Sequence, residues 1–180
     1  MASAPQGHYL VAASQDSFYV RVIGLASMTN SVSLQEVLTD LPRQGFRRFI
    51  FDLGLCTGFD STFMGIVLGV AHAQLDPHLQ VAGSPDGIAV LMVNAREEHI
   101  RLLTEVGLHR VVRVRREPVD FPKLGLQRLE ERPADPRSRI RSIIAAHENL
   151  VRLGGPNIEK FGMLLETLKR EFNEDGTAGC

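Results

Sequence analysis

The sequence predicts an α/β fold in which helices pack on a mixed β-sheet, followed by a two-helix extension. Two short apolar segments, 9–13 and 18–23, flank the turn at 14–17, which predicts a β-hairpin. After this hairpin, apolar runs typical of buried strands alternate with segments that repeat apolar residues at helical spacing. A stretch rich in proline and charge then precedes two amphipathic segments. These patterns indicate one α/β domain with a helical hairpin at its carboxyl end.

Composition excludes several classes of protein. A chain of 180 residues with 44% hydrophobic content can bury a real core. A net charge of −1 argues against nucleic-acid or membrane binding by bulk electrostatics. The longest apolar run, 88–93, is far below the roughly 18–20 residues that cross a bilayer, and residues 1–6 lack the features of a secretory signal. Since Cys180 lies on a polar tail, no structural disulfide with Cys56 is expected. We expect a soluble cytoplasmic protein.

The first helices and the central strand follow from local patterns. Ser33 and Glu36 have capping-box spacing, and Pro42 ends the helix that they begin. Segment 48–53 is so continuously apolar that we expect a central strand covered on both faces. Segment 62–74 reads as the second helix.

The rest of the domain follows the same alternation. The expected elements are an exposed loop at 75–87, a buried strand at 88–93, a helix that Asn94 and Glu97 begin and Gly107 ends, and an edge strand at 110–114.

The carboxyl-terminal third divides into a linker and a helical hairpin. We place the α/β domain at residues 1–118 and a linker, with a short helix near 125–131, at 119–137. The hairpin and its tail follow at 138–180. Pro156 suits the start of the second helix. Because neither helix can bury its apolar stripe alone, the hairpin should pack on the domain, on a second copy, or on another partner.

The segment around Ser61 is the most informative part of the chain. Asp60, Ser61 and Thr62 open a helix just beyond a buried strand, and helix N-termini favour anions such as phosphate. These residues are consistent with an ordinary helix cap or with a regulatory phosphorylation site. Gly65 and Gly69 lie four residues apart on another face, which suggests that a second backbone approaches closely there.

This motif resembles that of the STAS domain family, whose best-known members are bacterial anti-sigma factor antagonists. In that family a hydrophobic strand and a short loop precede Asp-Ser-(Ser/Thr)-Gly-Leu-Gly and an aliphatic helix. The matching residues here are Asp60, Ser61, Thr62, Gly65 and Gly69, with Phe63 in place of the first glycine. Further agreement comes from Val93-Asn94, Leu102-Leu103 and Gly107-Leu108, so that the resemblance covers about residues 8–118.

The resemblance implies a non-enzymatic signalling protein without a cofactor. Ser61 would be phosphorylated by a serine kinase that is itself an anti-sigma factor, and a cognate phosphatase would reverse this. The unphosphorylated form would bind the kinase and release a sigma factor. The expected partner surface is the loop at 55–60 with the first turns of the following helix, and it comprises Gly58, Phe59, Asp60, Thr62 and Phe63 around Ser61. The terminal helices could form a homodimer.

Other chemistry has weaker support in the sequence. The six histidines lack the spacing of a metal site, and Ser61 lacks both the Gly-x-Ser-x-Gly elbow of a hydrolase and a histidine marked as its base. The arginines near 113–116 and 137–141 fit a solvated edge and a helix start better than a nucleic-acid site. Two other functions stay open: a constitutive scaffold that binds through the terminal helices, and a small-ligand sensor that uses loop 75–87.

Overall fold

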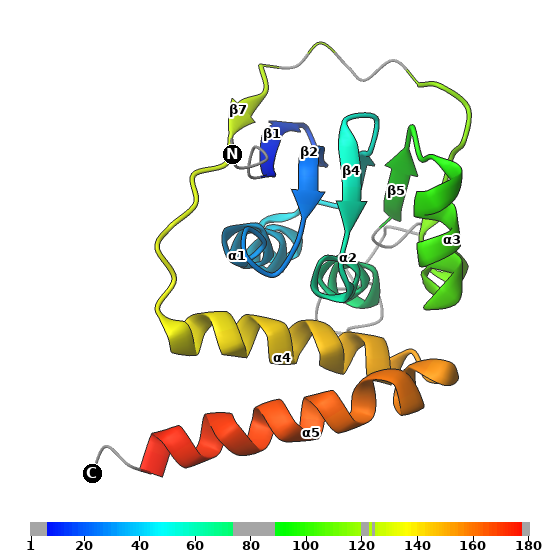
Figure 1. Cartoon of the computed structure of the whole chain (residues 1–180). Helices are drawn as coiled ribbons and strands as arrows, with labels where there is room; N and C mark the ends of the chain where they lie inside the picture. The colour runs from blue at the N-terminus through cyan, green and yellow to red at the C-terminus, as the bar shows by residue number, and fades with distance from the viewer. Residues whose placement is uncertain (1–6, 74–88, 120–122, 124, 178–180) are drawn as a thin grey trace, which may run out of the picture.

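The computed structural model describes residues 7–73, 89–119, 123 and 125–177 (Figure 1). The strands are β1 (His8–Ser14), β2 (Ser17–Ala26), β3 (Arg48–Asp52), β4 (Cys56–Phe59), β5 (Ala89–Val93), β6 (Arg113–Val114) and β7 (Gln127–Arg128). The α-helices are α1 (Val32–Asp40), α2 (Ser61–Ala73), α3 (Glu97–Glu105), α4 (Pro136–Arg152) and α5 (Pro156–Thr177). Within the described ranges, none of these helices is long and apolar enough to span a membrane.

The strands form one mixed sheet in the order β6-β5-β3-β2-β1-β7, and β4 pairs with the end of β2. The hairpin β1–β2 is antiparallel, as is the pair β1–β7. The pairs β2–β3, β3–β5, β5–β6 and β2–β4 are parallel. Parallel neighbours need crossover connections, and helices α1, α2 and α3 lie in the corresponding parts of the chain.

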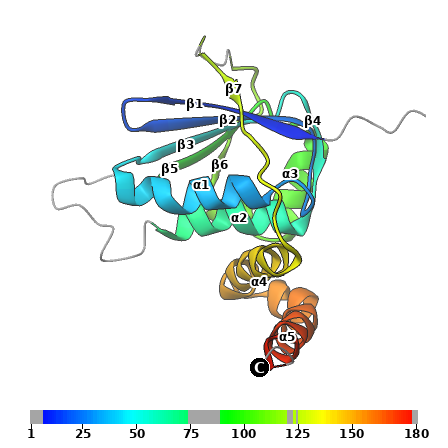
Figure 2. The ribbon, with the colours of Figure 1, turned by 90° about the vertical axis from the view of Figure 1, so that its left-hand side faces the viewer.

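The molecule is layered. Helices α1 and α2 lie on one face of the sheet, α4 packs on α2, and α5 packs on α4 (Figure 2). The terminal hairpin therefore packs on the domain of its own chain, which was one of the three alternatives left by the sequence. Within the described part of the chain, no helix covers the opposite face of the sheet (Figure 2). Ile50 of β3 is accordingly only half-buried, so the expectation of cover on both faces of this strand is wrong.

The predicted α/β fold, with helices packed on a mixed sheet and a two-helix extension, is confirmed. Two strands differ from the expected elements. The loop before Ser61 contains β4, and the expected short helix near 125–131 is replaced by β7, which adds to the edge of β1. The segment treated as a linker thus contributes to the sheet. The expected loop at 75–87 lies outside the described residues.

The expected helix caps also differ. Helix α1 begins after Ser31 rather than Ser33, and the Ser33 hydroxyl accepts the backbone N–H of Arg132 instead. Helix α3 begins after Arg96. Asn94 instead has a left-handed φ of 57° and donates through its amide to Asp52 at 2.8 Å. Both side chains therefore join distant segments, a role that local spacing does not reveal.

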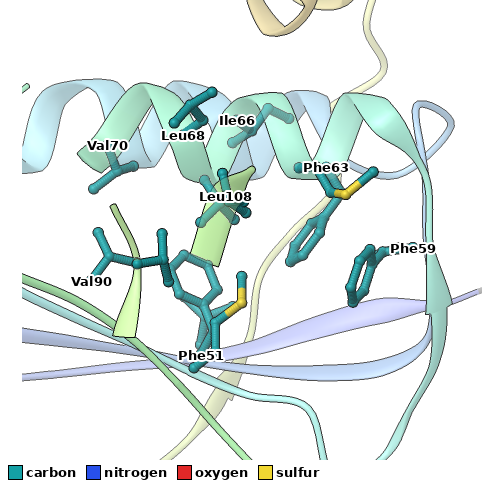
Figure 3. Close-up of a cluster of buried hydrophobic side chains, with 14 of the residues drawn as sticks. Phe51, Phe59, Phe63, Ile66, Leu68, Val70, Val90 and Leu108 are labelled. Carbon is teal, nitrogen blue, oxygen red and sulfur yellow. The ribbon is translucent and has the colours of Figure 1, made fainter. Parts of the chain in front are cut away.

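An aromatic cluster anchors the start of α2 in the core (Figure 3). Phe63 is 0% exposed, and its ring centroid lies 5.5 Å from that of Phe59, 6.1 Å from that of Phe51 and 6.3 Å from that of Tyr9. The bulky residue that stands at a glycine position of the STAS pattern therefore points inward.

Replacing Phe63 with alanine should lower the free energy of unfolding by about 3–5 kcal/mol, because it empties a fully buried aromatic site. Urea denaturation measures this change. Leu55→Ala is the control: its side chain is 60% exposed, and the expected change is within about 0.5 kcal/mol. Equal effects of the two substitutions would contradict this account of the core.

Candidate functional site

Strand β4 delivers the chain to the start of α2. After β3, residues Gly54 and Leu55 form an exposed turn. The Leu55 carbonyl accepts the N–H of Gly24 on β2 at 3.0 Å. The chain then pairs with the end of β2, and the N–H of Asp60 donates to Ala26 at 3.0 Å. These backbone bonds fix the position of Ser61, the first residue of α2.

Asp60 is the residue that caps α2. Its Oδ1 accepts the N–H of Phe63 at 3.0 Å, the bond that an N-cap side chain makes to the first turn. Its Oδ2 accepts the N–H of Met28 at 2.8 Å, which ties the loop after β2 to the same point. The hydroxyl of Ser61 is therefore not needed as a cap.

The Ser61 hydroxyl instead contacts the terminal hairpin. Its Oγ lies 3.1 Å from Nε2 of His147 on α4, and Nδ1 of His147 lies 2.8 Å from the carbonyl oxygen of Ile143. A carbonyl oxygen can only accept, so Nδ1 carries a proton. In the neutral imidazole Nε2 is then an acceptor, and Ser61 donates to it. Sequence reasoning assigned His147 to the apolar stripe of its helix and not to this site.

The expected partner surface needs a correction. Phe59, Thr62 and Phe63 are 6%, 3% and 0% exposed, because β4 and the first turn of α2 direct these side chains into the core. Gly58, Asp60 and Ser61 remain half-buried. The Ser61 hydroxyl at the centre of this surface is partly covered by α4, through its contact with His147.

Three exposed apolar side chains lie along the segments that lead to Ser61, and only Leu55 belongs to the loop that the sequence analysis expected as partner surface. Leu25, Met28 and Leu55 are 51%, 46% and 60% exposed. All three lie at one edge of the sheet, since β2 and β4 pair there and Met28 is bonded to Asp60. We call these three residues the apolar rim. No periodic pattern marks it, because its members come from separate loops and strand ends.

The Ser61–His147 pair resembles part of a hydrolytic site. A hydrolase also needs space for substrate and donors for an oxyanion beside the nucleophile. The cavities between α1, α2 and α4, and those beside α1, are lined by neither Ser61 nor His147. Among the described residues, no three His, Cys, Asp or Glu side chains are grouped to hold a metal ion. The pair is better suited to hold a hydroxyl in place than to attack a substrate.

Arg96 and His99 support β4 from the side of α3. The Arg96 guanidinium donates to the Cys56 carbonyl at 2.6 Å, and the ring of His99 packs on Phe59 with centroids 5.3 Å apart. His99 is 1% exposed, and its Nδ1 accepts the N–H of Arg96 at 3.2 Å, which requires the neutral ring. Burial, with the Arg96 charge adding to it, lowers the pKa of His99.

This lowered pKa predicts a loss of stability in mild acid. The unfolded chain, with a histidine pKa of about 6.5, binds a proton before the folded chain does. The contribution of His99 is therefore complete above about pH 6.5 and declines as the pH falls through the lower pKa of the folded state. Urea unfolding at about pH 7.5 and about pH 5.5 measures the decline, and His99→Gln should reduce it. The same decline in both proteins would assign the effect to other groups, such as His72, whose pKa burial also lowers.

No family model matches this chain, and a search of curated proteins finds no match. Among solved structures, the chain is similar to the anti-sigma factor antagonist SpoIIAA in its unphosphorylated form, with a TM-score of 0.47 and 15% identity over 62% of this chain and 90% of that chain. It is also similar to the phosphorylated form of SpoIIAA, a Bacillus cell fate determinant, with a TM-score of 0.45 and 16% identity over 59% of this chain and 90% of that chain. Both are proteins of the type that the motif around Ser61 resembles.

Proposed function

We propose that this protein is a non-enzymatic signalling protein of the cytoplasm that acts like an anti-sigma factor antagonist. Its switch is the reversible phosphorylation of Ser61, which controls binding of a serine kinase that is also an anti-sigma factor. A cognate phosphatase resets the switch. The observation that supports this most directly is that Asp60, and not Ser61, caps α2. The serine at this helix start is thus not needed as its cap.

The group transfer is a simple displacement. The Ser61 Oγ–H loses its proton to a base of the kinase, the new O–P bond forms as the bond between the β- and γ-phosphates of ATP breaks, and ADP leaves. The product carries about −1.5 to −2 charge. The helix dipole favours that charge by about 0.3–2 kcal/mol, whereas the Asp60 carboxylate opposes it. The net electrostatic effect on α2 itself is small, and the effect on a docked partner is large.

The apolar rim is the surface proposed for the kinase. Leu25, Met28 and Leu55 are exposed side chains on β2, the loop after β2 and the turn before β4, which lead to Ser61, whereas the side chains of Phe59, Thr62 and Phe63 are buried. Exposed apolar residues flanking a charge switch allow a partner to bind by hydrophobic contact and to leave when the charge appears. Gly58 and Asp60 remain part of this surface, because each is half-buried beside the rim.

Protein isolated from its native host should contain a fraction heavier by one phosphate, and phosphatase treatment should remove the difference. Intact-mass spectrometry measures this, and peptide mapping should place the group on Ser61. The Ser61→Ala protein expressed in the same host is the control and should lack the heavier fraction. Phosphate that persists in the variant, or that is absent under every growth condition, would contradict the proposal.

A second candidate function, a constitutive scaffold, is favoured by one observation. Helix α5 exposes three large apolar side chains: Ile158 at 58%, Met163 at 80% and Leu164 at 45%. Such side chains suit a partner or a second copy of the chain. A scaffold of this kind would bind independently of Ser61.

Three variants separate the candidates once a kinase partner is identified. Ser61→Asp should weaken binding to the kinase by about 1.4 kcal/mol or more, at least tenfold in Kd, while Ser61→Ala should bind like the wild type. Calorimetry of the purified proteins measures both. Met163→Glu changes only the exposed face of α5 and should leave this binding unchanged. Loss of binding in Met163→Glu, with equal binding by both Ser61 variants, would favour the scaffold.

A further inference from the structure

Helix α4 crosses α2 in very close contact. A Cβ atom built on Gly65 would lie 2.1 Å from the carbonyl oxygen of Ala146, a distance that no real contact allows. One turn further, a Cβ on Gly69 would lie 2.6 Å from the side-chain nitrogen of Asn149. The amide of Asn149 also donates to the Gly65 carbonyl at 3.0 Å. The expectation that a second backbone approaches this glycine pair is confirmed, and that backbone is α4.

This contact seats His147 on Ser61. The imidazole is 2% exposed and is held from three sides: by the Ser61 hydroxyl on α2, by the Ile143 carbonyl on its own helix and by Phe161 on α5. The rings of His147 and Phe161 lie edge-on with centroids 5.5 Å apart. Both helices of the hairpin therefore act together in covering the serine.

Moving the hairpin off α2 would break no strand pairing among the described residues. Segment 129–135, which has no regular secondary structure, joins the hairpin to β7, and in the described part of the chain no strand follows it. The polar ties that the described residues make between the hairpin and the rest of the chain come from side chains of the hairpin. They are Ser142 to Gln35, Asn149 to Gly65, Asn157 to Val106, His147 to Ser61 and the ion pair of Lys160 with Glu105. Burial of Ala146, Leu150 and Phe161, which are 0%, 0% and 7% exposed, favours the closed arrangement.

We propose that the α4–α5 hairpin is a removable cover over Ser61, and that the seated hairpin and phosphorylated Ser61 exclude each other. In the closed state the buried imidazole accepts the Ser61 Oγ–H, the proton that a kinase base must remove. A phosphoryl group on Oγ would replace that hydrogen and would compete with the seated imidazole for the same space. The kinase acts on the open state, and phosphorylation holds the hairpin open. The mutual exclusion with phosphorylated Ser61 rests on the proposed function, whereas the cover over Ser61 does not.

The first experiment measures access to position 61 without a kinase. Ser61→Cys, combined with Cys180→Ser, is treated with iodoacetamide, and peptide mapping follows the labelling rate. The native Cys56 is buried, and burial raises the pKa of its thiol, so its own labelling is slow. The introduced thiol should react far more slowly than that of Leu55→Cys, which marks an exposed loop. Adding Gly65→Ala should accelerate labelling at position 61 about tenfold or more, because the new Cβ displaces α4.

A matched substitution controls for the glycine change itself. Gly69→Ala makes the same exchange one turn along α2, but the new Cβ meets only the movable amide of Asn149, so the increase should be smaller. If Gly65→Ala fails to fold, Asn149→Ala removes the bond to Gly65 without adding an atom and should also accelerate labelling. Labelling at position 61 that equals the Leu55→Cys rate, or that no α4-displacing variant changes, would overturn the cover.

The second experiment tests mutual exclusion with a charge at position 61. Hydrogen exchange of the α4 amides is compared in the wild type, Ser61→Ala and Ser61→Glu. The wild type and Ser61→Ala should keep α4 protected, whereas Ser61→Glu should lose this protection while β3 and β5 retain theirs. Full protection of α4 in Ser61→Glu would overturn mutual exclusion. Neither experiment uses a kinase, so their failure is distinguishable from the absence of phosphate on Ser61 in the native host.

Discussion

The close approach of α2 and α4 at Gly65 is the contact on which the arrangement of the site depends. Because residue 65 has no side chain, the backbone of α4 can lie directly on α2, and the Asn149 amide can reach the Gly65 carbonyl. That depth of packing brings His147 within hydrogen-bond distance of Ser61. A helix held even about 1 Å further away would place His147 beyond hydrogen-bond distance of the Ser61 hydroxyl. The hydrogen bond of that hydroxyl thus depends on a glycine one turn away.

The first turn of α2 is fixed by contacts on its core-facing side, and α4 lies over its other side. Phe63 fills the core beneath the first turn, where it packs against Phe59 and Tyr9. Asp60 caps the same turn and also binds the loop after β2 through Met28. Phe63, which departs from the STAS pattern, is therefore accommodated in the core and leaves the surface unaltered. Because these contacts fix the first turn of α2, Ser61 keeps a constant position relative to the apolar rim.

The molecule offers two distinct features to a partner, a partly covered serine and an exposed apolar rim. Leu25, Met28 and Leu55 are accessible while the hairpin is seated, because β2, the loop after β2 and the turn before β4 expose them. Ser61 is half-buried, and the hairpin covers its hydroxyl in part. In the proposed switch, docking and modification are controlled separately, because the proposed partner would bind at the rim while the population of the open state would set how fast the serine reacts. Opening of the hairpin, as proposed, needs no movement of the sheet.

Local pattern by itself determined the helices, most of the strands and the place of Ser61 at a helix start, because periodicity and breaking residues act within a few positions. It failed where a distant segment decided the outcome. Strand β7 exists because β1 offers an edge, and Ser33 bonds to Arg132 instead of capping its own helix. The partner of Ser61 lies 86 residues away, in a histidine that the sequence assigns to an apolar stripe. Only the packing of one helix on another decides which side chains meet, since that depends on the shapes of both surfaces and not on the spacing within either.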